Sequence, residues 1–117
     1  MDRPIVSAEA QGLYDLVAAG LSSESGAVLG KMMGMPILYL AGKGFAGLYG
    51  DAMVFKLEGD VHVAALALAS ATLFDPSGMG RPMKAWVQVP PTHETQWAEL
   101  ARKAEAGQNG REPGPDN

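Results

Sequence analysis

Four short apolar segments joined by very short turns constrain the fold of this chain more than any other feature. We predict strands at residues 27–33, 36–40, 45–49 and 52–57. The turns between them are Gly34-Met35-Pro36, Ala41-Gly42-Lys43-Gly44 and Gly50-Asp51, which are rich in residues that interrupt regular structure. Connections this short join antiparallel neighbours, because a parallel crossover needs about a dozen residues or more. The sequence therefore predicts an antiparallel meander.

The last of these strands indicates how the sheet is buried. Side chains alternate between the two faces of a strand, so Met53, Phe55 and Leu57 point one way while Val54 and Lys56 point the other. We expect the first face to be buried beneath helices and the second face to be at least partly exposed to water.

A helix is predicted ahead of the meander, at residues 7–21. Ser7 is a suitable N-cap, and Glu9 places an acid at the positive end of the helix. Gly20 suits the end of the helix. The expected apolar stripe, flanked by Tyr14, consists of Leu13, Leu16, Val17 and Leu21.

Two further helices are predicted after the meander. Asp60 can cap a short helix at residues 61–69, and Thr92 can cap a last helix that runs to Lys103. The apolar stripe of the short helix consists of Val63, Leu66 and Ala67. The inward-facing residues of the last helix are Trp97, Leu100, Ala101 and Ala104.

A second pair of strands lies between these two helices. Leu73 and Phe74 end one strand, and residues 83–89 form the other. Pro90-Pro91 stops the second strand, because proline cannot donate a hydrogen bond to the ladder. The turn that joins the strands, Asp75-Pro76-Ser77-Gly78-Met79-Gly80, is made of residues that favour tight backbone geometry.

These elements follow one another in the order α-ββββ-α-ββ-α. We therefore predict an α+β domain with an antiparallel sheet of about five to six strands and helices packed on one face. The domain is expected over residues 1–106. Residues 107–117 contain no large apolar side chain to bury, so a disordered tail is expected there.

Charge and composition exclude several classes of protein. The formal net charge of −4 over 117 residues argues against binding that depends on many phosphate contacts. The absence of cysteine excludes disulfides and thiolate metal sites, and it is compatible with a reducing compartment. The sequence shows neither an apolar signal segment nor a run of about 20 apolar residues. We expect a soluble cytoplasmic protein that does not associate with membranes.

Two cations and a tryptophan follow the 75–80 turn, although the geometry of the turn does not require them. Arg81 and Lys84 lie just before Trp86, and Lys84 and Trp86 share strand parity, so these two are expected on one face. Lys56 also points away from the apolar side of its strand. Cations beside an exposed aromatic ring can bind an anionic ligand, a nucleic-acid phosphate and base, or an acidic segment of a partner. The simpler interpretation is a solvated face whose lysines prevent edge-to-edge aggregation.

No arrangement typical of catalysis or metal binding is found in the sequence. His62 and His93 do not have the spacing of a metal site, and Ser22, Ser23 and Ser25 lack the context of a nucleophile. Gly42-Lys43-Gly44 has the composition of a phosphate loop, but it joins two strands, so a hairpin turn explains it better.

Three acids each have a structural explanation. Asp51 fits a tight Gly-Asp turn, Asp60 a helix cap and Asp75 an Asp-Pro turn. We therefore predict no catalytic, metal-binding or cofactor-binding residue, and no cofactor. The predicted site for a partner or an anion consists of Lys56, Arg81, Lys84 and Trp86.

Several short motifs resemble the N-terminal domain of the TfoX/Sxy competence-regulator family. They are Lys31-Met32-Met33-Gly34-Met35, Gly42-Lys43-Gly44-Phe45-Ala46, Met53-Val54-Phe55-Lys56-Leu57, Phe74-Asp75-Pro76, Gly80-Arg81-Pro82-Met83-Lys84 and Trp86-Val87-Gln88-Val89-Pro90. The resemblance implies an antiparallel sheet with helices on one side. Two departures are Met33, where the family usually has phenylalanine, and the absence of the C-terminal helical domain of the full-length regulators, so a stand-alone domain is expected.

Three hypotheses on function follow. The first is a non-catalytic regulatory or binding module of this type, which binds a protein partner or another copy of itself. The second is a small ligand-binding protein or enzyme with a pocket between sheet and helix, in which His62 or Asp75 has a perturbed environment. The third, which the resemblance implies, is a DNA-associated regulator of competence-type transcription, whose binding would depend on salt.

Overall fold

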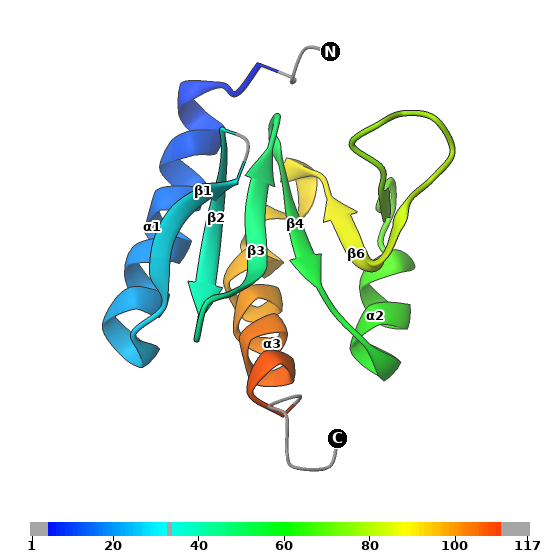
Figure 1. Cartoon of the computed structure of the whole chain (residues 1–117). Helices are drawn as coiled ribbons and strands as arrows, with labels where there is room; N and C mark the ends of the chain where they lie inside the picture. Colours follow the sequence, from blue (N-terminus) through cyan, green and yellow to red (C-terminus); the bar gives the residue numbers. More distant parts are fainter. Residues whose placement is uncertain (1–4, 33, 111–117) are drawn as a thin grey trace.

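A six-stranded antiparallel sheet in the order β1-β2-β3-β4-β6-β5 organises the computed structural model, which describes residues 5–32 and 34–110 (Figure 1). The strands are β1 (Val28–Met32), β2 (Met35–Leu40), β3 (Lys43–Tyr49), β4 (Ala52–Lys56), β5 (Thr72–Phe74) and β6 (Met83–Val89). The helices are α1 (Ala8–Ser25), α2 (Gly59–Leu66) and α3 (Trp97–Gly110), with a short 3-10 helix η1 (Pro91–Gln96) before α3. The α+β class and the order α-ββββ-α-ββ-α are confirmed.

The predicted meander forms, with strand ends that differ from the prediction by one or two residues. Gly50-Asp51 joins β3 to β4, where Tyr49 pairs with Ala52. Ala41-Gly42 joins β2 to β3, where Leu40 pairs with Lys43, so the Gly42-Lys43-Gly44 segment belongs to a hairpin. Ala41 and Gly42 both have positive φ, 53° and 80°, which is the backbone geometry of a tight hairpin turn.

The second strand pair also forms, and β6 joins it to the meander. β6 pairs with β4 on one side, with Phe55 opposite Val87, and with β5 on the other side, with Leu73 opposite Val87. β6 is therefore a central strand, although it comes last in the sequence of strands. β5 is a three-residue edge strand whose register shifts between Leu73 and Phe74.

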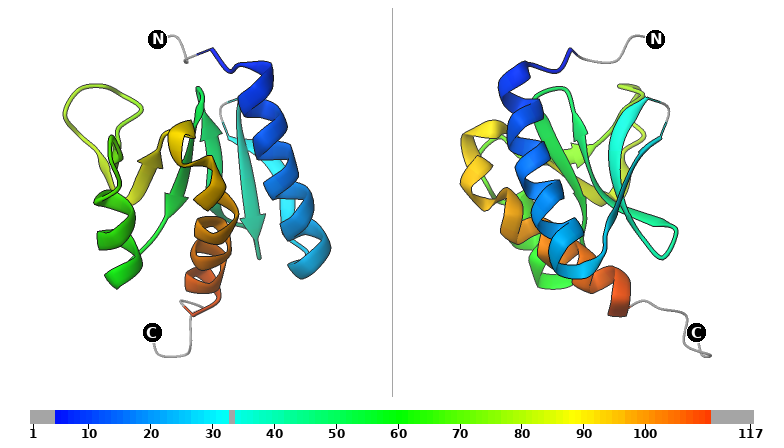
Figure 2. Two further views of the ribbon diagram at one scale, coloured as in Figure 1. Left: turned by 180° about the vertical axis from the view of Figure 1, so that it is seen from behind. Right: turned by 90° about the vertical axis from the view of Figure 1, so that its left-hand side faces the viewer.

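The helices lie together on one side of the sheet (Figure 2). The core between the two layers includes Met53, Phe55 and Leu57 of the 52–57 segment, as the strand alternation predicted. The predicted inward face of the last helix is also confirmed, because Trp97, Ala101 and Ala104 are fully buried and Leu100 nearly so. Within residues 5–32 and 34–110, no helix combines the length and the apolar character that a membrane crossing requires.

The predicted apolar stripe of α1 is wrong in part. Leu16 is 73% exposed, whereas Tyr14, which was expected only to flank the stripe, is buried. The fully buried face consists of Ala10, Tyr14, Ala18 and Leu21. Small alanines let the helix approach the sheet and α3 closely, and this places the large Tyr14 ring inside. Size at the contact, rather than hydropathy alone, therefore decides which side of α1 faces inward.

The predicted end of α1 is also wrong. Ser7 caps the start, since its hydroxyl accepts a hydrogen bond from the Ala10 N–H, but the helix continues through Gly20 to Ser25. Burial of Leu21 on the next turn offsets the modest cost of a glycine within a helix. Gly26, at φ 80°, provides the left-handed C-cap, and its N–H donates to the Ser22 carbonyl.

Several predictions about α2 and α3 need correction. Asp60 lies in the first turn of α2, after Glu58 at the N-cap position, and α2 ends at Leu66. Val63 is 67% exposed, and Ala67 lies just past the end of α2 and is also exposed, because Ala65 is the residue of α2 that packs into the core. Thr92 lies in η1, so it does not cap α3.

The helix α3 also extends further than predicted. It continues to Gly110, so residues 107–110 are helical where a disordered tail was expected. Residues 111–117 of that expected tail, residues 1–4 of the predicted domain and Met33 lie outside the described residues.

The face of the sheet without helices is sealed in part by its own side chains. Val54 and Ile37 lie on this face and are fully buried, although Val54 was expected on a partly exposed face. Glycines make this possible: a Cβ on Gly47 would lie 2.7 Å from Ile37 Cδ1, and one on Gly30 would lie 2.9 Å from Tyr39 Cε2. The Ile37 and Tyr39 side chains therefore occupy the space that the missing Cβ atoms leave.

Candidate binding surface

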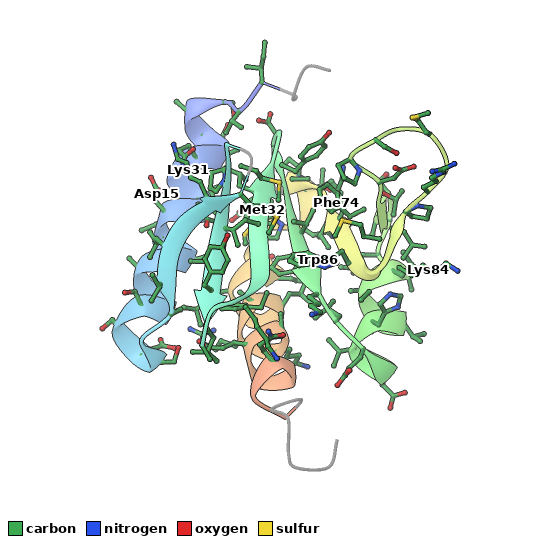
Figure 3. All side chains as sticks on the ribbon, viewed as in Figure 1. Asp15, Lys31, Met32, Phe74, Lys84 and Trp86 are labelled. Atoms are coloured by element: carbon green, nitrogen blue, oxygen red, sulfur yellow. The ribbon has the colours of Figure 1, made fainter. Side chains whose placement is uncertain are left out.

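Three aromatic rings form a row on the helix-free face of the sheet. The rings of Tyr49 and Phe74 meet edge to face, with centroids 4.9 Å apart. The Phe74 and Trp86 rings follow at 6.5 Å, and Figure 3 shows both of them in front of the sheet. We call Tyr49, Phe74 and Trp86 the aromatic patch. Phe74 is buried between its neighbours, while Tyr49 and Trp86 are half-buried and contribute the accessible surface.

Lys56 lies beside this patch because of the strand register. Lys56 of β4 is paired directly with Trp86 of β6. Directly paired residues in an antiparallel sheet place their side chains on the same face as close neighbours. Lys56 is half-buried, so its alkyl chain lies along the sheet while its ammonium group can remain in water. The structure thus brings together two of the four predicted site residues, Lys56 and Trp86.

The loop that contains Arg81 is held together by one carboxylate. Asp75 accepts hydrogen bonds from the Ser77 hydroxyl at 2.7 Å and from the N–H groups of Gly78 at 3.1 Å and Gly80 at 2.9 Å. The Ser77 bond is the main reason that the pKa of Asp75 lies below its ordinary value, and the backbone N–H groups of Gly80, Gly78 and Arg81 lower it further. Asp75 is therefore the structural centre of a defined loop.

Arg81 and Lys84 are both exposed, but they occupy different places around the patch. Arg81 lies in the loop that follows Asp75, beside the exposed Met79. Lys84 lies near the start of β6, and in Figure 3 its side chain projects outward, away from Trp86. In this view the Lys84 and Trp86 side chains therefore diverge. The register shift at Leu73/Phe74 falls at this end of β6, where the regular alternation of side chains is interrupted.

The two histidines link separate elements. His62 Nε2 of α2 donates to the Lys84 carbonyl of β6 at 2.8 Å. His93 Nε2 of η1 donates to the Ala69 carbonyl, in the segment between α2 and β5, at 2.9 Å. Each ring therefore has a role in fixing the positions of neighbouring segments. Among residues 5–32 and 34–110, no group of three or more His, Cys, Asp or Glu side chains is arranged to hold a metal ion.

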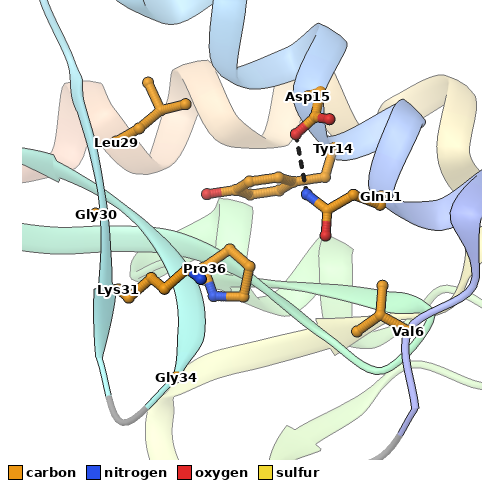
Figure 4. A pocket seen from close by; sticks show the side chains of 9 residues that line it. All are labelled: Val6, Gln11, Tyr14, Asp15, Leu29, Gly30, Lys31, Gly34 and Pro36. Carbon is orange, nitrogen blue, oxygen red and sulfur yellow. Dashed lines mark hydrogen bonds between the residues drawn. The ribbon is translucent and has the colours of Figure 1, made fainter.

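Cavities between described residues lie on the helix side of the sheet. One, of about 500 Å³, separates α1 from β1 and β2 (Figure 4), and the other, of about 320 Å³, lies between α2 and α3. Neither of these two cavities is lined by His62 or Asp75, the residues expected in a pocket between sheet and helix.

Sequence reasoning missed two members of the aromatic patch. Tyr49 and Phe74 were assigned only to strand ends, and their contact depends on the path of β5 along the far side of β6. One signal was available for Tyr49: it ends a strand next to a Gly-Asp turn, opposite the small Ala52, which leaves room above the sheet.

Comparison of this chain with protein families, with curated proteins and with solved structures finds no match.

Proposed function

We propose that this domain is a non-catalytic binding module that recognises an acidic segment of a protein partner through the helix-free face of its sheet. The observation that carries the proposal is the pairing of Lys56 with Trp86, next to the aromatic row that Phe74 and Tyr49 continue. Aromatic rings supply apolar contact area with little loss of side-chain freedom, and a neighbouring ammonium group selects for negative charge.

The charges around the aromatic patch support an acidic partner. Arg81 and Lys84 are exposed where the loop enters β6, so they add positive charge at the rim of this part of the sheet. The nearest acid in the loop, Asp75, already accepts several hydrogen bonds from the loop itself. Rim charges of this kind mainly increase the rate of association and the specificity of binding.

The resemblance to the N-terminal domain of the TfoX/Sxy family supports a regulatory role for the module. A cytoplasmic location fits this role and the lack of cysteine. The net charge of −4 argues against binding that depends on many phosphate contacts, so the proposed recognition depends on the local cations Lys56, Arg81 and Lys84.

The test is an NMR titration of the whole chain with a glutamate-rich peptide that contains one phenylalanine. The comparison peptide has glutamine in place of every glutamate, and a single-stranded DNA oligonucleotide is titrated separately. We expect the acidic peptide alone to shift the amide signals of Lys56, Trp86 and Arg81. Lys56→Gln or Trp86→Ala should weaken its binding about tenfold. Lys43→Gln is the matched control, since Lys43 is an exposed lysine at the β2–β3 turn, and should leave binding unchanged.

Three outcomes would contradict the proposal. Equal affinity for the two peptides would show that the negative charge of the peptide does not contribute to binding. Binding of the oligonucleotide alone, with an affinity that falls steeply with salt, would favour the DNA-associated alternative. A dimer in light scattering, in which the Trp86 amide is already shifted without any peptide, would show that a second copy of the chain occupies this face.

A further inference from the structure

The aromatic patch consists of a buried ring between two accessible ones. Phe74 is only 4% exposed, while Tyr49 and Trp86 on either side of it are half-buried. Their centroids lie 4.9 and 6.5 Å from that of Phe74. The row is therefore about as long as one turn of a polyproline II helix, which rises about 9 Å. A rigid segment with that repeat can rest on both outer rings at once.

Gln88 is a further polar residue on the same face of the sheet. It lies two residues after Trp86 on β6, and it is paired with Val54 of β4, which lies on the helix-free face. Directly paired residues share a face, so the side chain of Gln88 lies on the face of the aromatic patch. Gln88 is half-buried, and within residues 5–32 and 34–110 its amide makes no hydrogen bond. The amide is therefore available to a partner as a donor.

The indole N–H of Trp86 is a second donor on this face. The ring is half-buried, and its Nε1 makes no hydrogen bond in the described part of the chain. Donors of this kind match a polyproline II backbone, whose carbonyl groups make no internal hydrogen bonds. A helical partner would already use its carbonyl groups within the helix, and a partner in the β conformation would bind at a strand edge. The two donors therefore favour a polyproline II segment.

Charge distinguishes the two ends of the aromatic patch. Lys56 is paired with Trp86 at one end. Asp51 lies in the turn next to Tyr49 at the other end, where its carboxylate accepts a hydrogen bond from the Ser7 N–H at 2.9 Å. A negative residue of the partner is stabilised beside Lys56 and disfavoured beside Asp51. The acidic part of a bound segment is therefore expected at the Trp86 end.

On the basis of the proposed function, we propose that the acidic partner segment contains prolines and binds in the polyproline II conformation. Its proline rings pack on Tyr49 and Trp86, above Phe74. Its carbonyl oxygens accept hydrogen bonds from the Trp86 indole N–H and from the Gln88 amide. Its acidic residue lies beside the Lys56 ammonium group. No covalent step is involved.

The test compares three peptides in NMR titrations of the whole chain. The first has five prolines followed by three glutamates, the second has alanine in place of every proline, and the third has glutamine in place of every glutamate. We expect the first peptide to shift the amide signals of Trp86 and Gln88 and the indole N–H signal of Trp86. The other two peptides should each bind about tenfold more weakly. Trp97 is fully buried, so its indole signal is the internal reference.

Two variants assign the hydrogen bonds. Gln88→Met keeps the length of the side chain and removes the amide, and Trp86→Phe keeps a ring and removes the indole N–H. Each should weaken binding of the first peptide about fivefold or more, because each removes one hydrogen bond. Gln96→Met is the matched control, since Gln96 is exposed in η1 beside the cavity between α2 and α3, and should have no effect.

The outcome with the alanine peptide distinguishes the polyproline II conformation from the proposed function. Equal affinity for the alanine and proline peptides at the Trp86 signals would show that this conformation is not recognised, while binding of an acidic segment would stand. Equal affinity for the glutamate and glutamine peptides would instead contradict the proposed function. If none of the peptides shifts these signals, both proposals are wrong. Unchanged affinity of the Gln88→Met variant would overturn the role assigned to Gln88.

Discussion

Ser25, the last residue of α1, is hydrogen-bonded through its hydroxyl to the carboxylate of Glu105 on α3, eighty residues further along the chain. Glu105 is only 7% exposed, whereas the nearby ion pair between Arg102 and Glu24 is about half exposed on each side. An exposed pair contributes little to stability, but a buried carboxylate that loses its partner is costly. The Ser25–Glu105 contact therefore fixes the position of α1 against α3.

We predict that Ser25→Ala lowers the free energy of unfolding by about 1–3 kcal/mol, because it leaves the Glu105 carboxylate buried without this donor. Urea denaturation measures the change. Ser23→Ala is the control, since Ser23 is exposed on the same helix and should have little effect. The double variant Ser25→Ala/Glu105→Leu should recover part of the loss. Equal effects of the two serine substitutions would show that the contact contributes nothing.

Two glycine-to-alanine substitutions should have opposite effects. Gly12→Ala should stabilise the protein by about 0.5–1 kcal/mol, because Gly12 lies within α1 with open space around it. Gly47→Ala should destabilise it by about 1–3 kcal/mol, because the new Cβ would lie 2.7 Å from both Ile37 Cδ1 and the Pro36 carbonyl oxygen. Thermal unfolding measures both changes. A neutral Gly47→Ala would mean that Ile37 moves aside freely.

The buried indole of Trp97 should tolerate loss of its N–H better than loss of its volume. Trp97 is fully buried, and its Nε1 has no hydrogen-bond partner among the described residues. Trp97→Phe should cost less than about 2 kcal/mol, because it removes an unpaired donor, whereas Trp97→Ala should cost about 3–5 kcal/mol. Chemical denaturation of the two variants tests this difference. Equal costs would indicate that the N–H group is satisfied in solution.

Acid should loosen the loop that Asp75 organises. The pKa of Asp75 is lowered in the folded chain, chiefly by the Ser77 hydroxyl, so folding favours the charged carboxylate. The stabilising contribution is complete above the ordinary pKa of an aspartate, and it is lost as the pH falls through the lower folded value. The amide signals of Gly78 and Gly80 should move together in that acidic range.

Asp75→Asn is the control for this titration. It should abolish the acid transition at Gly78 and Gly80, while the amide of Gly42, which lies at another turn, serves as the reference in both proteins. A transition that persists in the variant would assign it to another group.

The local pattern of the sequence was sufficient for the hairpins of the meander but not for the helix faces. The Gly50-Asp51 and Ala41-Gly42 turns determine the hairpins directly, because two-residue connections leave one way to pair the strands. By contrast, Leu16 of α1 faces water while Ala18 is buried. Hydropathy favours leucine at a buried position, but the distance between α1 and its neighbours favours alanine, and that distance is a property of the assembled fold.

The candidate site could be predicted only in part, because it also depends on contacts of the assembled fold. Strand parity placed Lys56 on the helix-free face, but its pairing with Trp86 depends on β6 lying beside β4, which is a long-range contact. Parity alone did not show that the Lys84 side chain is directed away from Trp86, at the end of β6 where the register with β5 shifts. The burial of the Tyr14 hydroxyl without a hydrogen-bond partner among the described residues is likewise visible only in three dimensions.

The glycines beneath Ile37 and Tyr39 have a consequence for how this domain can diversify. A sheet face that its own side chains seal does not need a second layer to remain folded, so its accessible residues are free to change. Chains that share this architecture but serve different partners should therefore retain glycine at positions 30, 44 and 47 and differ at positions 56 and 86. The division between residues that maintain the fold and residues that select the partner would then be visible within a single face of the sheet.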